Sequence, residues 1–306
     1  MNPAISRVAL GTSAIAGLFT ATDDATARAT IDRAWELGVR DFDTAPLYGS
    51  GLAERRLGEA LRSRPRNEFT ISTKVGRLLR PGTPDPLFKG APPLRPVADF
   101  SPDGVRRSLD ESLARLQLDR VDTVLLHDPE DHLEAALTAV DSLRELDLDV
   151  GIGVGTNSVE TALTFVRHAS IDHVLIAGRY TPLDQSAGQD LLPLCAARGV
   201  TISAAGVFNS GLLVGGTTFD YDPAPSHLIA RARALEVTCS RYGVPLPALA
   251  IHFPLRHPAV SMVVVGARTA SEIEQDIAFL RHPIPDELWL QLRAPTAAAH
   301  RGTPHR

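Results

Sequence analysis

Four residues whose side chains could together move a proton stand at the ends of short apolar segments. They are Asp43, Tyr48, Lys74 and His127. In a barrel or a doubly wound sheet, parallel strands end at one mouth and present such groups to a common cavity. A site of this composition can transfer a proton while a bound cofactor transfers a hydride. The sequence therefore predicts an oxidoreductase site.

The residue types suit acid–base chemistry on a tyrosine, whose ordinary pKa of about 10 makes it inefficient near neutral pH. The ammonium of Lys74 would favour the phenolate of Tyr48, and the Asp43 carboxylate would keep that ammonium charged and oriented. A neutral His127 imidazole could hydrogen-bond a substrate oxygen and favour the charge that develops there. Taken singly, each residue could be a solvated charge, a turn residue or a hydrogen-bonded residue at the rim. Their joint occurrence at successive strand ends favours catalysis.

Three motifs around these residues resemble those of the aldo-keto reductase family. They are DFDTAPLYG at 41–49, STKVG at 72–76 and LLHD at 125–128, and the resemblance runs from Leu10 to about Asp276. In that family the four matching residues form a catalytic tetrad, with the tyrosine as general acid or base. The resemblance implies the same roles here.

Further phrases resemble a narrower branch of the family, the aldose dehydrogenases such as L-fucose dehydrogenase and the pyridoxal dehydrogenases. They are GTS at 11–13, GIGVGTN at 151–157, AGRYT at 177–181 and FNSGLL at 208–213. This resemblance implies oxidation of a sugar at C1 to a lactone, with Tyr48 taking the hydroxyl proton. One alternative is an NADPH-dependent aldehyde, ketone or pyridoxal reductase. Another is a redox-sensing, cofactor-binding regulatory subunit, against which the intact tetrad argues.

Composition limits the partners of this chain of 306 residues and formal net charge −5. Its basic residues are scattered and no apolar run approaches a membrane span, so we expect neither nucleic-acid nor membrane partners. The N-terminus shows no targeting pattern, and Cys195 and Cys239 have no metal or redox spacing, which favours the cytoplasm and no bound metal. A closed barrel leaves no free strand edge, so we expect a monomer or a weak homo-oligomer.

Eight apolar, β-branched runs alternate with eight amphipathic stretches. The predicted strands are 7–10, 38–43, 69–75, 121–126, 150–154, 173–177, 200–204 and 260–265, and the predicted helices are 23–37, 52–62, 103–116, 132–146, 158–168, 188–198, 226–242 and 271–280. This alternation forces parallel pairing with right-handed crossovers, and eight such units close a TIM (β/α)8 barrel. We predict one barrel domain over residues 1–294 and a flexible tail at 295–306.

Two segments depart from the regular alternation. Residues 245–256 have helical spacing and predict an additional helix. Residues 78–101 contain six prolines and predict a long irregular loop after the third strand, either a lid over the active site or a rigid loop. Two helix starts are also marked, by Ser101 before a proline and by Thr269 with Glu272 as a capping box.

The cofactor is expected to be a nicotinamide dinucleotide, NAD or NADP, because nothing in the chain itself accepts two electrons. Without a Rossmann fingerprint, the loops after the seventh and eighth strands would bind its phosphates. The residues expected there are Gly206, Val207, Phe208, Asn209, Ser210, Gly211, Gly266, Ala267 and Arg268. The resemblance adds Gly11, Thr12, Asp43, Asp276 and Asn157, the last matching the asparagine that holds the nicotinamide carboxamide. Asn157 could instead cap the following helix.

Two departures from the wider family bear on cofactor choice. Many members carry a glutamine where this chain has Ala177, and Arg179 could replace its contact. At the adenosine end, the chain has Gly266, Ala267 and Glu272 where NADP-dependent members use a Lys-Ser pair and an arginine. A carboxylate repels a 2′-phosphate and can accept a ribose hydroxyl, which favours NAD. Arg268 remains a possible phosphate partner, and Glu272 could act only in its capping box.

Overall fold

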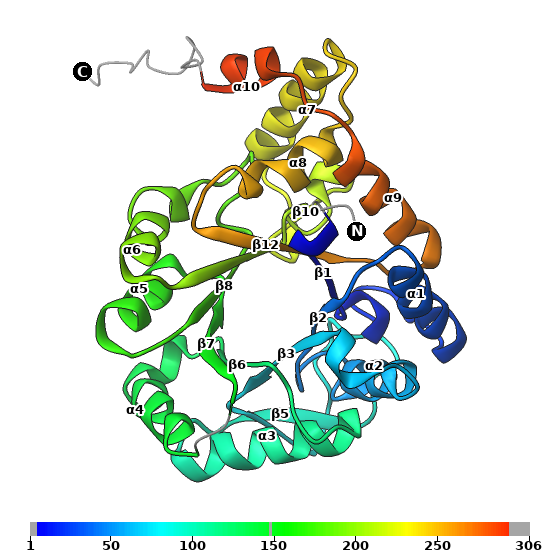
Figure 1. The fold of residues 1–306 in the computed structure, drawn as a ribbon. Coiled ribbons are helices and arrows are strands. Elements are labelled where there is room, and N and C mark those ends of the chain that lie inside the picture. Colours follow the sequence, from blue (N-terminus) through cyan, green and yellow to red (C-terminus); the bar gives the residue numbers. More distant parts are fainter. Residues whose placement is uncertain (1–4, 147–148, 294–306) are drawn as a thin grey trace, which may run out of the picture.

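A computed structural model describes residues 5–146 and 149–293 of the chain. Eight parallel strands close into a barrel in the spatial order β1-β12-β9-β8-β7-β6-β3-β2, and helices surround it (Figure 1). The barrel strands are β1 (Val8–Gly11), β2 (Asp41–Asp43), β3 (Thr70–Val75), β6 (Thr123–His127), β7 (Gly151–Thr156), β8 (His173–Ala177), β9 (Thr201–Ala205) and β12 (Val260–Gly266). All eight predicted strands and the TIM barrel are confirmed.

The eight predicted helices and the additional helix at 245–256 are present. The α-helices are α1 (Asp24–Glu36), α2 (Leu52–Leu61), α3 (Pro102–Leu116), α4 (Leu133–Arg144), α5 (Val159–His168), α6 (Leu191–Arg198), α7 (Ser226–Ser240), α8 (Leu246–Leu255), α9 (Ala270–Arg281) and α10 (Asp286–Arg293). Short 3-10 turns are η1 (Ile5–Arg7), η2 (Ala14–Ala16), η3 (Arg66–Glu68), η4 (Glu130–His132), η5 (Ser186–Gly188) and η6 (Leu212–Val214). The predicted cap on α3 is confirmed, since the Ser101 side chain accepts the amide of Gly104 at 3.0 Å.

Side chains along the barrel strands alternate between two cores, as the pleat of a strand requires. Leu10 and Phe42 belong to the larger core, which includes the apolar faces of the surrounding helices. Leu125, Leu175 and Val264 belong to a separate small cluster contributed by alternate positions of the strands. Two residues further along β6, the inward alternation passes from Leu125 to His127, whereas on β8 and β12 it reaches Ala177 and Gly266. The polar groups of the barrel mouth therefore come from a subset of the strands.

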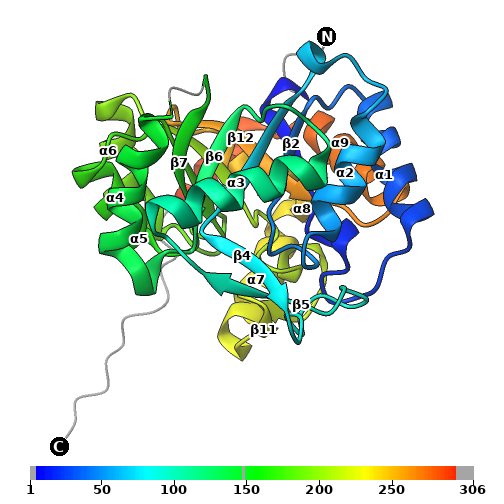
Figure 2. The same ribbon diagram turned by 90° about the horizontal axis from the view of Figure 1, so that it is seen from below.

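The segment 78–101 is not the irregular loop that the sequence predicts. It forms an antiparallel hairpin of β4 (Arg77–Pro81) and β5 (Leu94–Ala98), which lies below α3 in Figure 2. A two-stranded ribbon has free edges, so Pro96 fits within β5 without breaking a ladder shared with a third strand. The prolines conceal the alternation of the strands, which explains why the prediction was wrong.

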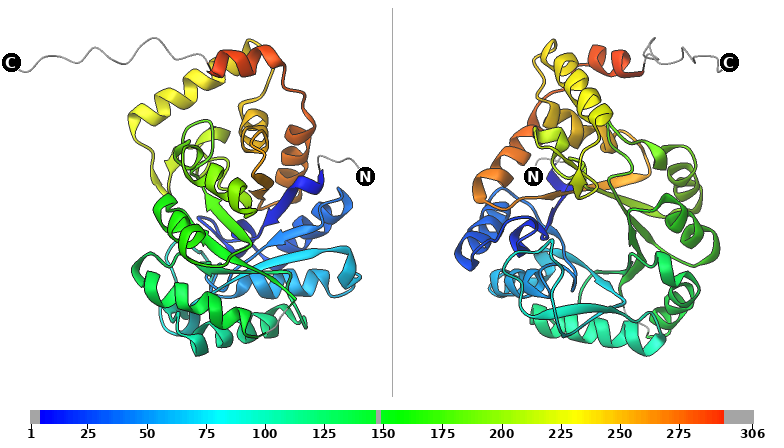
Figure 3. Two further views of the ribbon diagram at one scale, coloured as in Figure 1. Left: turned by 60° about the vertical axis from the view of Figure 1, so that its left-hand side comes forward. Right: turned by 180° about the vertical axis from the view of Figure 1, so that it is seen from behind.

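Helices α7, α8 and α10 gather at one side of the barrel (Figure 3). Their apolar faces share a second core that includes Leu228, Leu249 and Trp289. A small hairpin of β10 (Thr218–Phe219) and β11 (Asp222–Pro223) precedes α7, and neither it nor α10 was predicted. No helix in the described ranges is both long and apolar enough to span a membrane. The tail predicted at 295–306 lies outside the described residues.

Candidate active site

The four residues singled out in the sequence meet at the C-terminal mouth of the barrel. The Lys74 Nζ donates to Asp43 Oδ1 at 2.7 Å and to the carbonyl of Thr44 at 2.9 Å. The same nitrogen lies 4.6 Å from the centroid of the Tyr48 ring. The rings of Tyr48 and His127 are nearly perpendicular, at 88°, with centroids 5.8 Å apart. The structure therefore brings a phenol, an ammonium, a carboxylate and an imidazole into one cluster.

The ion pair beneath the tyrosine is almost completely buried, with side-chain exposures of 1% for Lys74 and 5% for Asp43. The second carboxylate oxygen of Asp43 accepts the hydroxyl of Ser72 at 2.7 Å, from the neighbouring strand. A buried pair is tolerated when other hydrogen bonds support its charges, and here the Thr44 carbonyl and the Ser72 hydroxyl do so. Removing one partner would leave an uncompensated buried charge, at a cost of about 3–5 kcal/mol.

Burial sets the protonation of Tyr48 and His127 in the free protein. It raises the pKa of the Tyr48 phenol well above its ordinary value, and the charges of Asp43, Tyr221 and Asp128 raise this pKa further. Burial, followed by the positive charges of Lys74 and Arg77, lowers the pKa of His127 well below its ordinary value. At neutral pH the site therefore combines a protonated phenol with a neutral imidazole, which can donate to or accept from a substrate oxygen.

Two functional candidates were not found in the sequence, Arg77 and Asp128. Arg77, the first residue of β4, donates from Nε to the His127 carbonyl at 3.3 Å and from Nη2 to the Asp128 carbonyl at 2.8 Å. It thereby fixes the backbone that carries the imidazole. Burial and the Glu130 carboxylate raise the pKa of Asp128 to about 6. Asp128 is the last residue of the LLHD motif. Its residue type alone did not distinguish a functional carboxylate from an ordinary solvent-exposed one.

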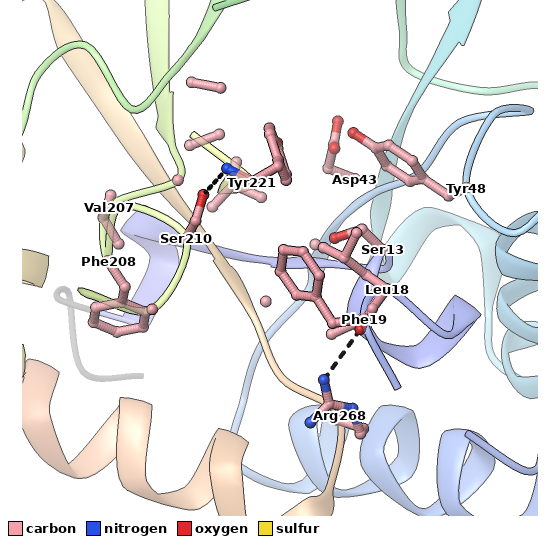
Figure 4. Close-up of a pocket in the computed structure, with 18 of the residues that line it drawn as sticks. Ser13, Leu18, Phe19, Asp43, Tyr48, Val207, Phe208, Ser210, Tyr221 and Arg268 are labelled. Carbon is pink, nitrogen blue, oxygen red and sulfur yellow. Dashed lines mark hydrogen bonds between the residues drawn. The ribbon is translucent and has the colours of Figure 1, made fainter. Parts of the chain in front are cut away.

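Two cavities of about 420 and 260 Å³ adjoin this cluster. The residues bordering both are Ser13, Leu18, Tyr48, Leu175, Ala177 and Tyr221. Lys74 and His127 line the smaller cavity. The larger cavity extends from Asp43 and Tyr48 to Arg268 (Figure 4). Tyr48 therefore stands where an elongated cavity and a compact one meet.

The larger cavity contains most of the residues expected to bind a dinucleotide. Those that line it are Gly11, Asp43, Gly206, Val207, Phe208, Ser210, Gly211, Gly266, Arg268 and Glu272. A Cβ added at Gly266 would meet no atom closer than 4.0 Å, so its missing side chain leaves room in the cavity. The buried Nε of Arg268 has no hydrogen-bond partner within the described part of the chain. A glycine-lined cavity ending at an unsatisfied guanidinium nitrogen fits a phosphate-bearing dinucleotide.

Other expected cofactor residues do not line the larger cavity. Thr12 is buried and donates to the Asp43 carbonyl at 2.9 Å, bracing β2. Asn209 is buried, where it accepts the Thr181 hydroxyl at 2.7 Å. Ala267 and Asp276 are also buried away from the cavity lining. The predicted loops border the larger cavity, but the sequence did not resolve which of their residues face inward.

Asn157 and Arg179 were both considered for the carboxamide end of the cofactor. Asn157 lines the smaller cavity, and α5 is capped by Ser158, not by Asn157. Arg179 is absent from the linings of both cavities. It donates to the Asn157 carbonyl at 2.7 Å and pairs with Asp220 at 2.8 Å. Arg179 therefore ties together the loops after β7 and β9.

Glu272 was considered both as part of a capping box and as a contact for the cofactor. The Thr269 hydroxyl caps α9 by accepting the Glu272 amide at 3.2 Å. The Glu272 carboxylate accepts the amide of Arg268 at 2.7 Å, one residue before the cap. Its side chain nevertheless lines the larger cavity and is 45% exposed. Capping and a contact with a bound ligand are therefore compatible.

Residues 7–295 match the family model described as the Aldo/keto reductase family, and the chain belongs to that family. It is an oxidoreductase that uses a nicotinamide dinucleotide. In this class the cofactor supplies a two-electron donor or acceptor when it is bound.

Two relatives of known activity resemble most of the chain. D-threo-aldose 1-dehydrogenase from Pseudomonas sp is 39% identical over 94% of this chain and 93% of its own length. Pyridoxal 4-dehydrogenase from Microbacterium luteolum is 37% identical over 95% of this chain and 94% of its own length. Among solved structures, the holo form of aldo-keto reductase AKR11C1 from Bacillus halodurans has a TM-score of 0.74 at 23% identity. The structural match covers 94% of this chain and 90% of the AKR11C1 chain. At this identity it supports the fold alone.

Proposed function

We propose that the protein oxidises an aldose at C1 to the lactone and transfers the hydride to NAD. The observation that carries this proposal is the buried Lys74–Asp43 pair beneath Tyr48, at the junction of the two cavities. A relative named for oxidation of an aldose at position 1, at 39% identity, supports the substrate class. The reaction needs a base beside the hydroxyl that loses its proton, and the place of Tyr48 at the junction of the cavities supports that role.

The proposed roles follow from the contacts of each group. Tyr48 takes the proton of the C1 hydroxyl while the hydride leaves the same carbon, so that the C1–O single bond becomes a carbonyl. Lys74 favours the phenolate that Tyr48 must form, and Asp43 holds the lysine. The neutral imidazole of His127 hydrogen-bonds the reacting oxygen. In reverse, the same groups protonate a carbonyl during reduction.

The preference for NAD is also a proposal, and it rests on Glu272. Its carboxylate lines the larger cavity, where it would repel a 2′-phosphate and could accept a ribose hydroxyl. The other expected cofactor residues that line this cavity would hold the dinucleotide, and Asn157 its carboxamide. We further propose that residues 1–294 act as one catalytic domain, as a monomer or weak homo-oligomer in the cytoplasm.

A second candidate is reduction of aldehydes or ketones by NADPH. The apolar wall of the smaller cavity favours it, because Leu18, Leu47, Leu87 and Phe88 would suit a substrate with few hydroxyls. Absorbance at 340 nm distinguishes the candidates, with L-fucose, L-galactose, D-arabinose, pyridoxal and simple alcohols offered with NAD or NADP. Turnover of a sugar with NAD supports the aldose proposal. Inactivity with every sugar, together with oxidation of NADPH by aldehydes, refutes it.

A further inference from the structure

Asp128 follows His127 with an unusual backbone conformation. Its φ angle is 45°, in the left-handed region that residues other than glycine seldom adopt. Two backbone contacts hold it there: its amide donates to the Gly155 carbonyl at 2.9 Å, and its carbonyl accepts Arg77 Nη2 at 2.8 Å. A strained residue that is fixed from both sides invites a functional explanation.

The conformation places the Asp128 side chain at the smaller cavity, where it is 40% exposed. Within residues 5–146 and 149–293, no hydrogen-bond donor engages its carboxylate, and the neutral imidazole of His127 lies beside it, with Nε2 3.5 Å from Oδ2. The two other carboxylates near this side chain already accept hydrogen bonds from the protein. Glu130 accepts the Thr156 hydroxyl, and Asp85 accepts the Leu87 amide at 2.9 Å. Asp128 thus presents unused acceptor capacity to the cavity.

We propose that Asp128 is a specificity-determining residue that accepts the hydroxyl on the substrate carbon next to the reacting one. This inference rests on the proposed function, in which His127 holds the reacting oxygen. A carboxylate 3.5 Å from that imidazole can reach a hydroxyl on the adjacent carbon. An ionised carboxylate is an acceptor only, and a hydroxyl is its natural donor. The preferred substrates are therefore 2-hydroxylated aldoses.

A different role for Asp128, orientation of the His127 ring, makes a separable prediction. An orienting residue acts on the reacting oxygen, which every substrate has. Its removal would lower activity equally for all substrates. A residue that binds the adjacent hydroxyl affects only those substrates that carry it.

The test compares D-arabinose with 2-deoxy-D-ribose, which differs from it by loss of the C2 hydroxyl. The variants are Asp128→Gly and Asp128→Asn, because glycine and asparagine both tolerate a positive φ. Asp131→Asn is the control, since it removes the same charge from an exposed position in the same loop. Titration of NADH fluorescence checks that cofactor affinity is unchanged.

We expect Asp128→Gly to raise KM for D-arabinose by about 10- to 100-fold, the loss expected for a hydrogen bond to a charged group. Loss of the Asp128 charge also lowers the pKa of Tyr48 for every substrate, so the readout is the ratio of kcat/KM for D-arabinose to that for 2-deoxy-D-ribose, which should fall by about 10-fold or more. Asp128→Asn should also raise KM for D-arabinose, by less than Asp128→Gly does. This second variant keeps the test possible if the glycine variant does not fold. Equal losses on both sugars would overturn the inference while leaving the aldose proposal intact. Inactivity of the unmodified protein on every sugar would refute the proposed function itself.

Discussion

The chemistry at the residue scale depends on one buried positive charge. Lys74 contacts both the Asp43 carboxylate and the face of the Tyr48 ring, and among the residues that the structure describes it is the only lysine lining the smaller cavity. Burial, together with the charges of Asp43, Tyr221 and Asp128, raises the pKa of Tyr48 and so disfavours its phenolate. A tyrosine in this position therefore needs the lysine if it is to act as a base.

Replacement of Lys74 should change the pH dependence of oxidation. In Lys74→Met the pKa of Tyr48 rises further, so the rate increase that accompanies deprotonation should move to higher pH. Lys74→Arg keeps the charge and serves as the control. The measurement is kcat/KM for aldose oxidation between pH 6 and 10. A Lys74→Met profile that coincides with the parent profile would exclude electrostatic tuning by this lysine.

Replacement of Glu272 tests cofactor choice. Glu272→Gln removes the charge but keeps an oxygen that can accept the Arg268 amide. We expect the ratio of kcat/KM with NADP to that with NAD to rise by about 5- to 10-fold, because repulsion between charges about 4 Å apart at this solvent-exposed position amounts to about 1 kcal/mol. Glu274→Gln, at an exposed position of the same helix, should leave the ratio unchanged. A ratio equally unchanged in Glu272→Gln would remove the argument for NAD.

The sequence predicted that Asp43, Tyr48, Lys74 and His127 lie together, which the structure shows, but it did not single out Arg77 and Asp128. Asp43, Tyr48, Lys74 and His127 stood at strand ends, and parallel strands bring such ends together. The importance of Asp128 depends on its backbone conformation, which the residue type does not reveal.

At the scale of elements, the β4–β5 hairpin supports the end of β6, which carries His127. Its first residue, Arg77, bonds the carbonyls of His127 and Asp128, about fifty positions along the chain. Its tip is joined to the segment after β1, since the Phe19 amide donates to the Leu87 carbonyl at 2.8 Å. The Phe88 ring lies 6.1 Å from that of Tyr48. The loop of the hairpin thus contributes to the wall of the smaller cavity.

Loss of the Arg77 contact should impair catalysis without impairing cofactor binding. Arg77→Gln removes two bonds to the backbone that carries His127, so we expect kcat/KM to fall by about 10-fold. It also removes a positive charge that lowers the pKa of His127, so the acidic limb of the profile should move to higher pH. Arg80→Gln, whose parent side chain pairs with Glu111 on α3, is the control. Identical behaviour of the two variants would contradict a positioning role.

The regular elements were predictable because each has a clear apolar period. Strands such as Val260–Gly266 are rich in valine, and caps such as Ser101 mark helix starts. The β4–β5 hairpin was missed because its prolines interrupt the alternation, although free ribbon edges accommodate them. Hairpin β10–β11 was missed because each strand has only two residues.

At the scale of the whole molecule, barrel closure decides which residues of the cofactor loops face the cavity. It brings Gly11 of β1 beside Gly266 of β12, at opposite ends of the sequence. It also buries Thr12, Ala267 and Asn209 behind the cavity surface. These orientations depend on the register of strands distant in sequence, which local patterns do not contain.

The packing of α9 has a measurable consequence for stability. Burial and the nearby Glu272 carboxylate raise the pKa of Asp276 from 3.8 to about 7. A folded state that binds this proton more tightly than the unfolded chain loses stability as pH rises from about 4 to about 7. Asp276→Asn should therefore raise the free energy of unfolding at pH 8 by roughly 1–3 kcal/mol, and by less at pH 5.

Urea unfolding of the parent protein and of Asp276→Asn at both pH values measures this effect. Glu274→Gln is the control on the same helix, because its parent side chain forms an exposed pair with Arg33 and should contribute little. A stability gain of the same size at pH 5 and pH 8 would show that Asp276 does not titrate as described.

The central claim is that Tyr48 exchanges the proton during hydride transfer, and Tyr48→Phe tests it most directly. The variant keeps the ring beside Phe88 and His127 and loses only the hydroxyl. We predict an unchanged dissociation constant for NADH by fluorescence titration, and a kcat for aldose oxidation about 10²- to 10⁴-fold lower. A kcat near that of the parent protein would contradict the assignment of Tyr48 as the general base.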